Sequence, residues 1–228
     1  FDIVNILLEN KNIDVNIPNN DFKTPLYIAA NLGHTNILLK LVDVPGIIFR
    51  PLSSFASWGC TPLYEAVYFG YLDIVRILLD KDSTCINDIN YETSLTPLWL
   101  AVDEGQEEIV KLLLNKGADI NIKNTDYGIT PLFQAAYRDR EKILKLFLDK
   151  RAIDDSTLKD LLYKSALKGY KNICNMILNT NKISSRYLDK IISRLRDENY
   201  LSDIHYLDEQ LKIHRDIINL INDKCSQM

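Results

Sequence analysis

One four-residue frame recurs along this chain at nearly constant spacing. It reads Thr-Pro-Leu followed by an aromatic residue, with an Ala two residues after the aromatic, and it begins at Thr24, Thr61, Thr96 and Thr130. Successive starts lie 37, 35 and 34 residues apart. Self-similarity at such a period is typical of repeat proteins, in which each unit packs mainly against its neighbours. The sequence therefore predicts a stack of similar units.

Each unit reads as a helix, a turn and a second helix. Thr can cap free backbone donors, and Pro at the first helical position loses no hydrogen bond. Gly33, Gly70 and Gly105 follow the first helices, where Gly tolerates the left-handed conformation. Segments such as 73–79 then place apolar residues at helical spacing, with charged residues opposite. One such hairpin cannot bury both faces alone, but stacked copies can.

The units resemble ankyrin repeats, whose pattern includes Thr-Pro-Leu-His, an Ala pair, Gly-His, an Ile-Val and Leu-Leu stretch and Gly-Ala-Asp-Ile-Asn. The matching residues are Gly33-His34, Ile109-Val110 and Gly117-Ala118-Asp119-Ile120-Asn121. The resemblance covers roughly residues 1–181. It implies an all-α fold, an ankyrin-repeat solenoid of stacked helix-turn-helix units with a helical C-terminal cap.

The two ends of the chain depart from a complete repeat. Residues 2–8 match the second helix that begins at Asp73, so the chain is expected to open mid-repeat and to be a fragment of something longer. Residues 160–166 align with 130–136 and indicate a fifth, degenerate repeat. Two further amphipathic helices are predicted within 183–222. The expected division is a repeat stack over 1–181 and a helical cap or degenerate repeat over 182–228.

Several positions differ from the family pattern. Aromatic residues replace the usual His and suggest aromatic packing there; they are Tyr27, Tyr64, Trp99 and Phe133. The glycine of the Gly-x-Thr hairpin tip is present at Gly59 and Gly128 but is replaced by Phe22 and Ser94 in other units. The sequence therefore does not predict the conformation of those two tips. Residues 44–57 exceed the pattern and are expected to form an enlarged loop.

Charge and composition restrict the partners. The net charge is -4, with 14 basic against 20 acidic side chains in 1–150 and 13 against 11 in 151–228. No dense basic run supports nucleic-acid binding, and no apolar run approaches the ~20 residues of a membrane span. The four cysteines have neither close pairing nor metal-finger spacing, so reduced thiols and a cytoplasmic location are expected, in a host cytoplasm if the protein is a secreted effector.

Catalytic, metal and cofactor sites are not expected. His205 and His214 lie on opposite sides of a predicted helix, and His34, at a Gly-His step, suits a structural hydrogen bond. Cys60 has no base that the sequence places beside it. Gly-rich phosphate loops are absent from the sequence. A small-molecule substrate is therefore not expected either.

What the resemblance implies is recognition of a partner protein through the hairpin tips and the concave, exposed side of the first helices. Aromatic and Arg side chains dominate protein interfaces, and several stand at such positions here. The candidate partner-binding residues are Trp58, Tyr68, Phe69, Leu95, Asp103, Glu104, Tyr127, Tyr137 and Arg138. An alternative is that Trp58 and Phe69 fold under the enlarged loop as a satellite cluster.

The function expected is therefore that of a protein-interaction module, as an adaptor or a host-directed effector. The effector hypothesis comes from the richness in Ile, Asn and Lys, which hints at an AT-rich genome. Two alternatives remain open. The chain could be the substrate-targeting region of a larger enzyme whose catalytic domain lies outside this fragment, or a structural spacer without a ligand, which the aromatic set argues against.

Overall fold

The computed structural model describes residues 2–10, 12–50, 61–126, 128–149, 153–198 and 207–227, and in these ranges every regular element is an α-helix. The chain divides into two compact units, unit 1 over Phe1–Pro131 and unit 2 over Leu132–Met228. The helices are α1 (Asp2–Glu9), α2 (Pro25–Asn31), α3 (Thr35–Val42), α4 (Pro62–Tyr68), α5 (Leu72–Lys81), α6 (Pro97–Asp103), α7 (Glu107–Asn115), α8 (Pro131–Tyr137), α9 (Glu141–Asp149), α10 (Asp155–Leu167), α11 (Lys171–Leu178), α12 (Ser185–Glu198) and α13 (Leu207–Ser226).

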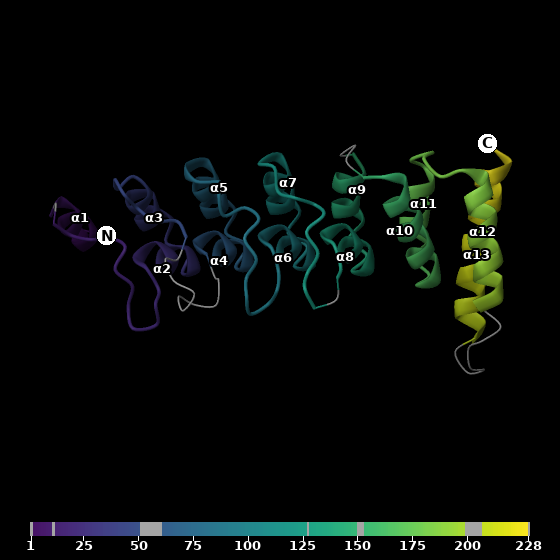
Figure 1. Ribbon diagram of the computed structural model, residues 1–228, viewed down its shortest axis with the longest axis horizontal. Coiled ribbons are helices and arrows are strands. Elements are labelled where there is room, and N and C mark those ends of the chain that lie inside the picture. Colours follow the sequence, from purple (N-terminus) through teal and green to yellow (C-terminus); the bar gives the residue numbers. More distant parts are fainter. Residues whose placement is uncertain are drawn as a thin grey trace. The chain divides into compact units, whose positions relative to one another are not determined.

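Unit 1 is built as two rows of helices. In Figure 1, α2, α4 and α6 lie side by side in one row, and α3, α5 and α7 lie side by side in the other. Each first helix also packs on the second helix of its own repeat. The core between the rows is apolar, and the Ala residue of each frame is buried, with Ala101 fully so. The predicted register of the repeats in unit 1 is therefore confirmed.

The Thr-Pro pairs start the first helices as predicted. The hydroxyl oxygens of Thr24, Thr61 and Thr96 each accept a hydrogen bond from the backbone N–H three residues on, at 3.2, 3.1 and 3.2 Å. Each following Pro occupies the first turn, where its missing N–H costs nothing. These local signals fix where α2, α4 and α6 begin.

Two aromatic residues of the frame, Tyr64 and Trp99, form hydrogen bonds to the next repeat in addition to packing in the core. Tyr64 and Trp99 are buried, and their polar ends reach the hairpin tip of the next repeat. Tyr64 Oη lies 2.8 Å from Thr93 Oγ1, and Trp99 Nε1 donates to Ile129 O at 3.1 Å. These rings thus bury apolar area and tie successive repeats together through hydrogen bonds.

Helix α1 has 8 residues, the same length as α3; that the chain opens mid-repeat stays a prediction. Ile3, Ile6 and Leu7 on this helix are exposed at 72%, 65% and 49%. Asn16 ties the following segment to the next repeat, because its Nδ2 donates to Gly46 O and its Oδ1 accepts from Ile48 N. In a later repeat, Asn87 forms a similar tie by accepting from Asp119 N at 2.9 Å.

Unit 2 contains the fifth repeat predicted from the sequence. Its first helix, α10, begins at Asp155 and is longer than the first helices of unit 1. Asp154 caps this helix: one carboxylate oxygen accepts from Thr157 N at 2.8 Å and the other from Thr157 Oγ1 at 2.7 Å. These hydrogen bonds hold the pKa of Asp154 well below its usual range. The capping residues therefore explain the early start of α10.

The two helices predicted after the fifth repeat are present as α12 and α13. They pack on each other, α12 packs on α10, and α13 packs on α10 and α11. Leu188 and Ile191 of α12 are buried, as are Ile217 and Ile221 of α13. Lys171 Nζ on α11 also lies 3.0 Å from Asp216 Oδ2 on α13. That 182–228 acts as a cap of a stack over 1–181 stays a proposal.

Candidate functional site

The turns between first and second helices form a row in unit 1. Gly33, Gly70 and Gly105 have φ of 73°, 74° and 73°, so they adopt the left-handed conformation predicted for them. A Cβ added to Gly33 would lie 2.8 Å from Tyr71 Cζ, and one added to Gly70 would lie 3.4 Å from Gln106 Nε2. Neighbouring turns therefore touch, because Tyr71 after Gly70 and Gln106 after Gly105 each lie against the glycine of the preceding turn.

An exposed cluster, which we call the aromatic patch, lies on this row; it comprises Leu32, Tyr68, Phe69 and Tyr71. The Tyr68 and Phe69 rings meet edge to face with centroids 5.0 Å apart, and Phe69 stacks on Tyr71 at 5.8 Å. Leu32 precedes Gly33, against which Tyr71 packs. Leu32, Tyr68 and Phe69 are exposed at 55%, 53% and 47%. The patch therefore presents apolar area to solvent, and three of its side chains, Tyr68, Phe69 and Tyr71, contact one another in a chain.

The other candidate residues of unit 1 occupy the next repeat. Asp103 ends α6 and is half-buried, while Glu104, its C-cap residue, is exposed. Leu95 is half-buried at the base of a hairpin tip, and its carbonyl accepts from Asn90 N at 2.9 Å. Asp103 and Glu104 thus stand on the turn next to that of Tyr68 and Phe69, and Leu95 stands at the tip.

Tyr137 and Arg138 occupy the corresponding turn in unit 2, and both are exposed. Lys168 Nζ lies 5.8 Å from the centroid of the Tyr137 ring, and Tyr170 Oη donates to the Tyr137 carbonyl at 3.0 Å. This tyrosine therefore meets two side chains of the following repeat, one of them cationic. Its side chain is still 55% exposed.

Two candidate residues, Trp58 and Tyr127, lie outside the described residues, as do Cys60, His205 and residues 51–57 of the enlarged loop. Whether Trp58 and Phe69 share a satellite cluster stays a prediction. One expectation needs correction: His34 is exposed, and its imidazole makes no hydrogen bond to any described residue. Its backbone N–H instead donates to Ala29 O at 2.9 Å, because the left-handed turn brings that carbonyl within reach.

The hairpin tips depend on asparagines that the sequence analysis did not single out. Asn19, Asn90 and Asn124 each stand at the base of a tip, and each donates its backbone N–H to a carbonyl on the other side of the tip. The Asn90 side chain accepts from Glu92 N and Thr93 N, both at 2.9 Å, and the Asn124 side chain accepts from Ile129 N at 2.8 Å. The signal available in the sequence was an Asn five or six residues before three of the four Thr-Pro pairs, those at Thr24, Thr96 and Thr130.

The two hairpin tips that lack the glycine of the family pattern still adopt the left-handed backbone conformation that glycine favours. Phe22 and Ser94 have φ of 61° and 59°, close to the 63° of Gly128. The backbone N–H of each donates to the carbonyl of the asparagine at the base of its tip. Hydrogen bonding therefore holds non-glycine residues in a left-handed conformation that costs them about 1–2 kcal/mol.

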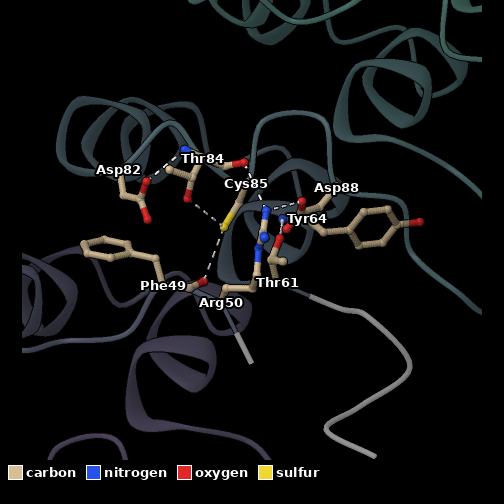
Figure 2. Close-up of polar contacts among 8 residues, drawn as sticks. All are labelled: Phe49, Arg50, Thr61, Tyr64, Asp82, Thr84, Cys85 and Asp88. Carbon is tan, nitrogen blue, oxygen red and sulfur yellow. Dashed lines mark hydrogen bonds and ion pairs between the residues drawn. The ribbon is translucent and has the colours of Figure 1, made fainter. Parts of the chain in front are cut away.

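A polar cluster in Figure 2 joins the start of the enlarged loop to the next repeat. Arg50 Nη2 donates to Asp88 Oδ1 at 2.5 Å and to Thr84 O at 3.1 Å, while Cys85 Sγ donates to Phe49 O at 3.8 Å. Burial, with a contribution from Asp88, raises the pKa of the Cys85 thiol. A protonated thiol is a poor nucleophile, so this cluster is suited to holding the loop.

The described part of the chain lacks two other kinds of site. No group of three or more His, Cys, Asp or Glu side chains in it is placed to hold a metal ion. Nor does any helix in that part have the length and apolar character needed to cross a membrane.

Comparison with known proteins identifies the repeats. A family model described as ankyrin repeats (3 copies) matches residues 1–92, 51–124 and 98–187. This chain belongs to the ankyrin-repeat family. Its fold is that of an all-α ankyrin solenoid, as the Thr-Pro-Leu frame predicted. Ankyrin repeats are generally protein-interaction modules, which indicates a protein partner.

Similar stretches occur in much longer proteins. The chain is 30% identical over 127 residues to the human transient receptor potential cation channel subfamily A member 1. It is 32% identical over 102 residues to the ankyrin repeat and KH domain-containing protein mask of Drosophila melanogaster, and 27% over 130 residues to a putative ankyrin repeat protein of Acanthamoeba polyphaga mimivirus. These matches cover 53%, 44% and 55% of this chain but only 11%, 2% and 16% of the relatives.

Proposed function

We propose that the chain binds a partner protein through its hairpin tips and the exposed ends of its first helices, as an adaptor or a host-directed effector. The observation that carries this proposal is the aromatic patch of unit 1. Large exposed apolar clusters on soluble proteins mark interaction surfaces more often than isolated apolar residues do. Tyr68 and Phe69 are therefore proposed as the central anchors.

The geometry of the patch suits tight recognition. Tyr68, Phe69 and Tyr71 contact one another in a chain, and Tyr71 packs on the turn of the preceding repeat. Side chains held in this way have little rotational freedom left to lose when a partner binds. Rigid aromatic anchors of this kind commonly supply most of the binding energy at an interface.

The remaining candidates are proposed to surround or extend these anchors. Asp103 and Glu104 flank the patch in unit 1, Leu95 stands at the hairpin tip of the same repeat, and Tyr137 with Arg138 offers a second anchoring pair in unit 2. Trp58 and Tyr127 keep their proposed role on the basis of their positions in the repeat pattern alone.

A pull-down with matched variants tests this function. Proteins captured by the unaltered chain are identified by mass spectrometry, purified and titrated against the Tyr68→Ala/Phe69→Ala and Tyr137→Ala/Arg138→Ala variants. Loss of a true anchor should cost about 2 kcal/mol or more, which is roughly a thirtyfold weaker Kd.

The control is Arg76→Ala/Lys111→Ala, which truncates two exposed side chains on the second helices. This variant should retain the partner. If it loses the partner while both anchor variants keep it, the binding surface lies on the second helices and the proposed function is wrong in its location.

A further inference from the structure

The charge around the aromatic patch has one sign. The segments 24–39, 61–75 and 96–110 cover each first helix of unit 1, its turn and the start of the second helix. They contain no Lys or Arg, and their carboxylates are Glu65, Asp73, Asp103, Glu104, Glu107 and Glu108. The first basic residues that follow these segments are Lys40, Arg76 and Lys111, farther along the second helices. A ligand on the turns therefore meets acidic side chains.

The carboxylates divide into structural and solvent-facing groups. Glu65 is buried, and its Oε2 accepts from Asn31 Nδ2 at 2.7 Å, so it links α2 to α4. Glu104 and Glu108 are exposed at the turn of the third repeat. That turn adjoins the patch, because Gln106 lies against Gly70. Packed helices lie about 8–10 Å apart, which sets the separation between the patch and these exposed carboxylates.

We infer that the aromatic patch binds a cationic protein segment, with one apolar or aromatic side chain on Tyr68 and Phe69 and a Lys or Arg side chain directed to Glu104 and Glu108. This inference rests on the proposed function and specifies its partner. Three residues of extended chain span about 10 Å, so the apolar and basic residues stand about three positions apart. Arg suits the basic position of the bound segment better than Lys, because its planar guanidinium group can donate two parallel hydrogen bonds to a carboxylate.

The physical reason for this choice of partner is complementarity. An apolar segment alone would leave the exposed carboxylates without a role in recognition, and an acidic segment would be repelled by them. Opposite charge beside an apolar anchor accelerates encounter and fixes the orientation of the bound segment. The same repulsion disfavours nucleic acid at this surface.

The probe is a phage-displayed library of random 12-residue peptides selected on the full chain. Enriched peptides should combine an apolar or aromatic residue with Lys or Arg about three positions away. Synthetic copies are then titrated by fluorescence anisotropy. We expect about tenfold weaker binding to Tyr68→Ala/Phe69→Ala and to Glu104→Lys/Glu108→Lys, and a similar loss between 0.05 and 0.5 M NaCl, because salt screens exposed charges.

A peptide of reversed charge distinguishes loss of charge recognition from misfolding of the Glu104→Lys/Glu108→Lys variant. Replacing the basic residues of a selected peptide by Glu should weaken binding to the unaltered chain and restore binding to Glu104→Lys/Glu108→Lys. The matched control Arg76→Glu/Lys111→Glu also changes the net charge by four units, in the opposite sense and at exposed positions on the second helices, and should bind the original peptide unchanged.

The other outcomes overturn the inference in distinguishable ways. Enriched peptides that lack basic residues, yet fail to bind Tyr68→Ala/Phe69→Ala, would contradict the cationic partner and leave the proposed function standing. Peptides that bind every turn variant as tightly as the unaltered chain but bind Arg76→Glu/Lys111→Glu more weakly would contradict both the inference and the proposed function. A library without any enriched peptide also overturns the inference, while the pull-down still decides the proposed function.

Discussion

At the scale of single residues, the hairpin tips show how hydrogen bonds can hold an unfavourable backbone conformation. Ser94 has the left-handed φ of 59° that Gly128 adopts, at 63°, in the equivalent tip. The Asn90 carbonyl accepts the Ser94 N–H at 2.8 Å, and the Asn90 side chain accepts two further N–H groups. The energy of these bonds offsets the strain at Ser94.

Replacing Ser94 therefore should change stability in a direction set by the new side chain. Ser94→Gly removes about 1–2 kcal/mol of strain and adds roughly 0.5–1 kcal/mol of chain entropy to the unfolded state, for a net gain of about 0.5 kcal/mol. Ser94→Val should instead destabilise by more than about 1 kcal/mol, because a β-branched residue tolerates positive φ poorly. Urea denaturation measures both.

Gly128→Ala is the matched control, because an added Cβ meets no heavy atom within 4 Å. Its cost, about 1 kcal/mol, comes from the backbone conformation alone. If Ser94→Gly and Gly128→Ala both left the urea midpoint unchanged, the tips would carry no strain.

The thiols provide a second residue-scale prediction. Burial raises the pKa of Cys174 to about 12, and burial also raises the pKa of Cys85. Burial also raises the pKa of the Cys225 thiol, so accessibility distinguishes the three: Cys85 and Cys174 are buried, whereas Cys225 is half-buried. Iodoacetamide followed by peptide mass spectrometry should therefore modify Cys225 well before Cys85 or Cys174. Equal labelling rates for Cys174 and Cys225 in the folded chain would contradict the packing of α11.

At the scale of helices, local sequence signals predicted the starts and ends of most elements. The Thr caps, the buried Ala residues and the left-handed turn glycines depend on neighbours within a few positions, so the repeated frame was sufficient to find them. The contact of Tyr71 with Gly33 joins residues of different repeats, and it follows from the stacking geometry. The exposure of Tyr68 and Phe69 was predicted from the pattern, but their chain of ring contacts with Tyr71 was not.

The longer helix α10 shows where the repeat pattern did not predict the start of an element. Alignment with the preceding repeat predicted a helix near residue 160, yet α10 begins at Asp155. Asp154 caps α10 through Thr157, and the repeat pattern does not predict this start because α2, α4 and α6 begin at a Thr-Pro pair instead.

Helix packing leads to a third prediction. Ala101 on α6 is fully buried, and α6 packs on α4 and α7. Ala101→Leu should overpack this contact and destabilise the chain by about 1–3 kcal/mol. Thermal and urea unfolding measure the change. Lys111→Leu places the same side chain at an exposed position on α7 and should be close to neutral, so a comparable loss there would show that the effect is not caused by packing.

At the scale of the whole molecule, the C-terminal helices α12 and α13 contribute buried apolar side chains to the core of unit 2. Both α12 and α13 pack on α10, and α13 also packs on α11. Deleting residues 183–228 should therefore expose apolar side chains of α10 and α11, raise the binding of a hydrophobic dye and promote aggregation. Size-exclusion chromatography and dye fluorescence measure both effects.

A point variant keeps this prediction testable if the deletion fails to express. Ile217→Ala removes a fully buried side chain of α13 and should cost about 2–5 kcal/mol, while Asn222→Ala changes an exposed position on the same helix. A monomeric 1–182 chain that unfolds at the same temperature as the full chain would show that α12 and α13 form a separate element.

In unit 1, the contact between neighbouring turns joins a glycine of one repeat to a different kind of side chain from the next repeat at each junction. Gly33 accommodates a tyrosine ring that a Cβ would meet at 2.8 Å, and Gly70 lies against a glutamine amide that a Cβ would meet at 3.4 Å. A repeat that was duplicated, or moved to another place in unit 1, would present its own side chain to a glycine that already accepts side chains of different size and polarity. New repeats could thus be added here without remodelling the neighbour, which is a property useful for lengthening such a protein by gene duplication or by design.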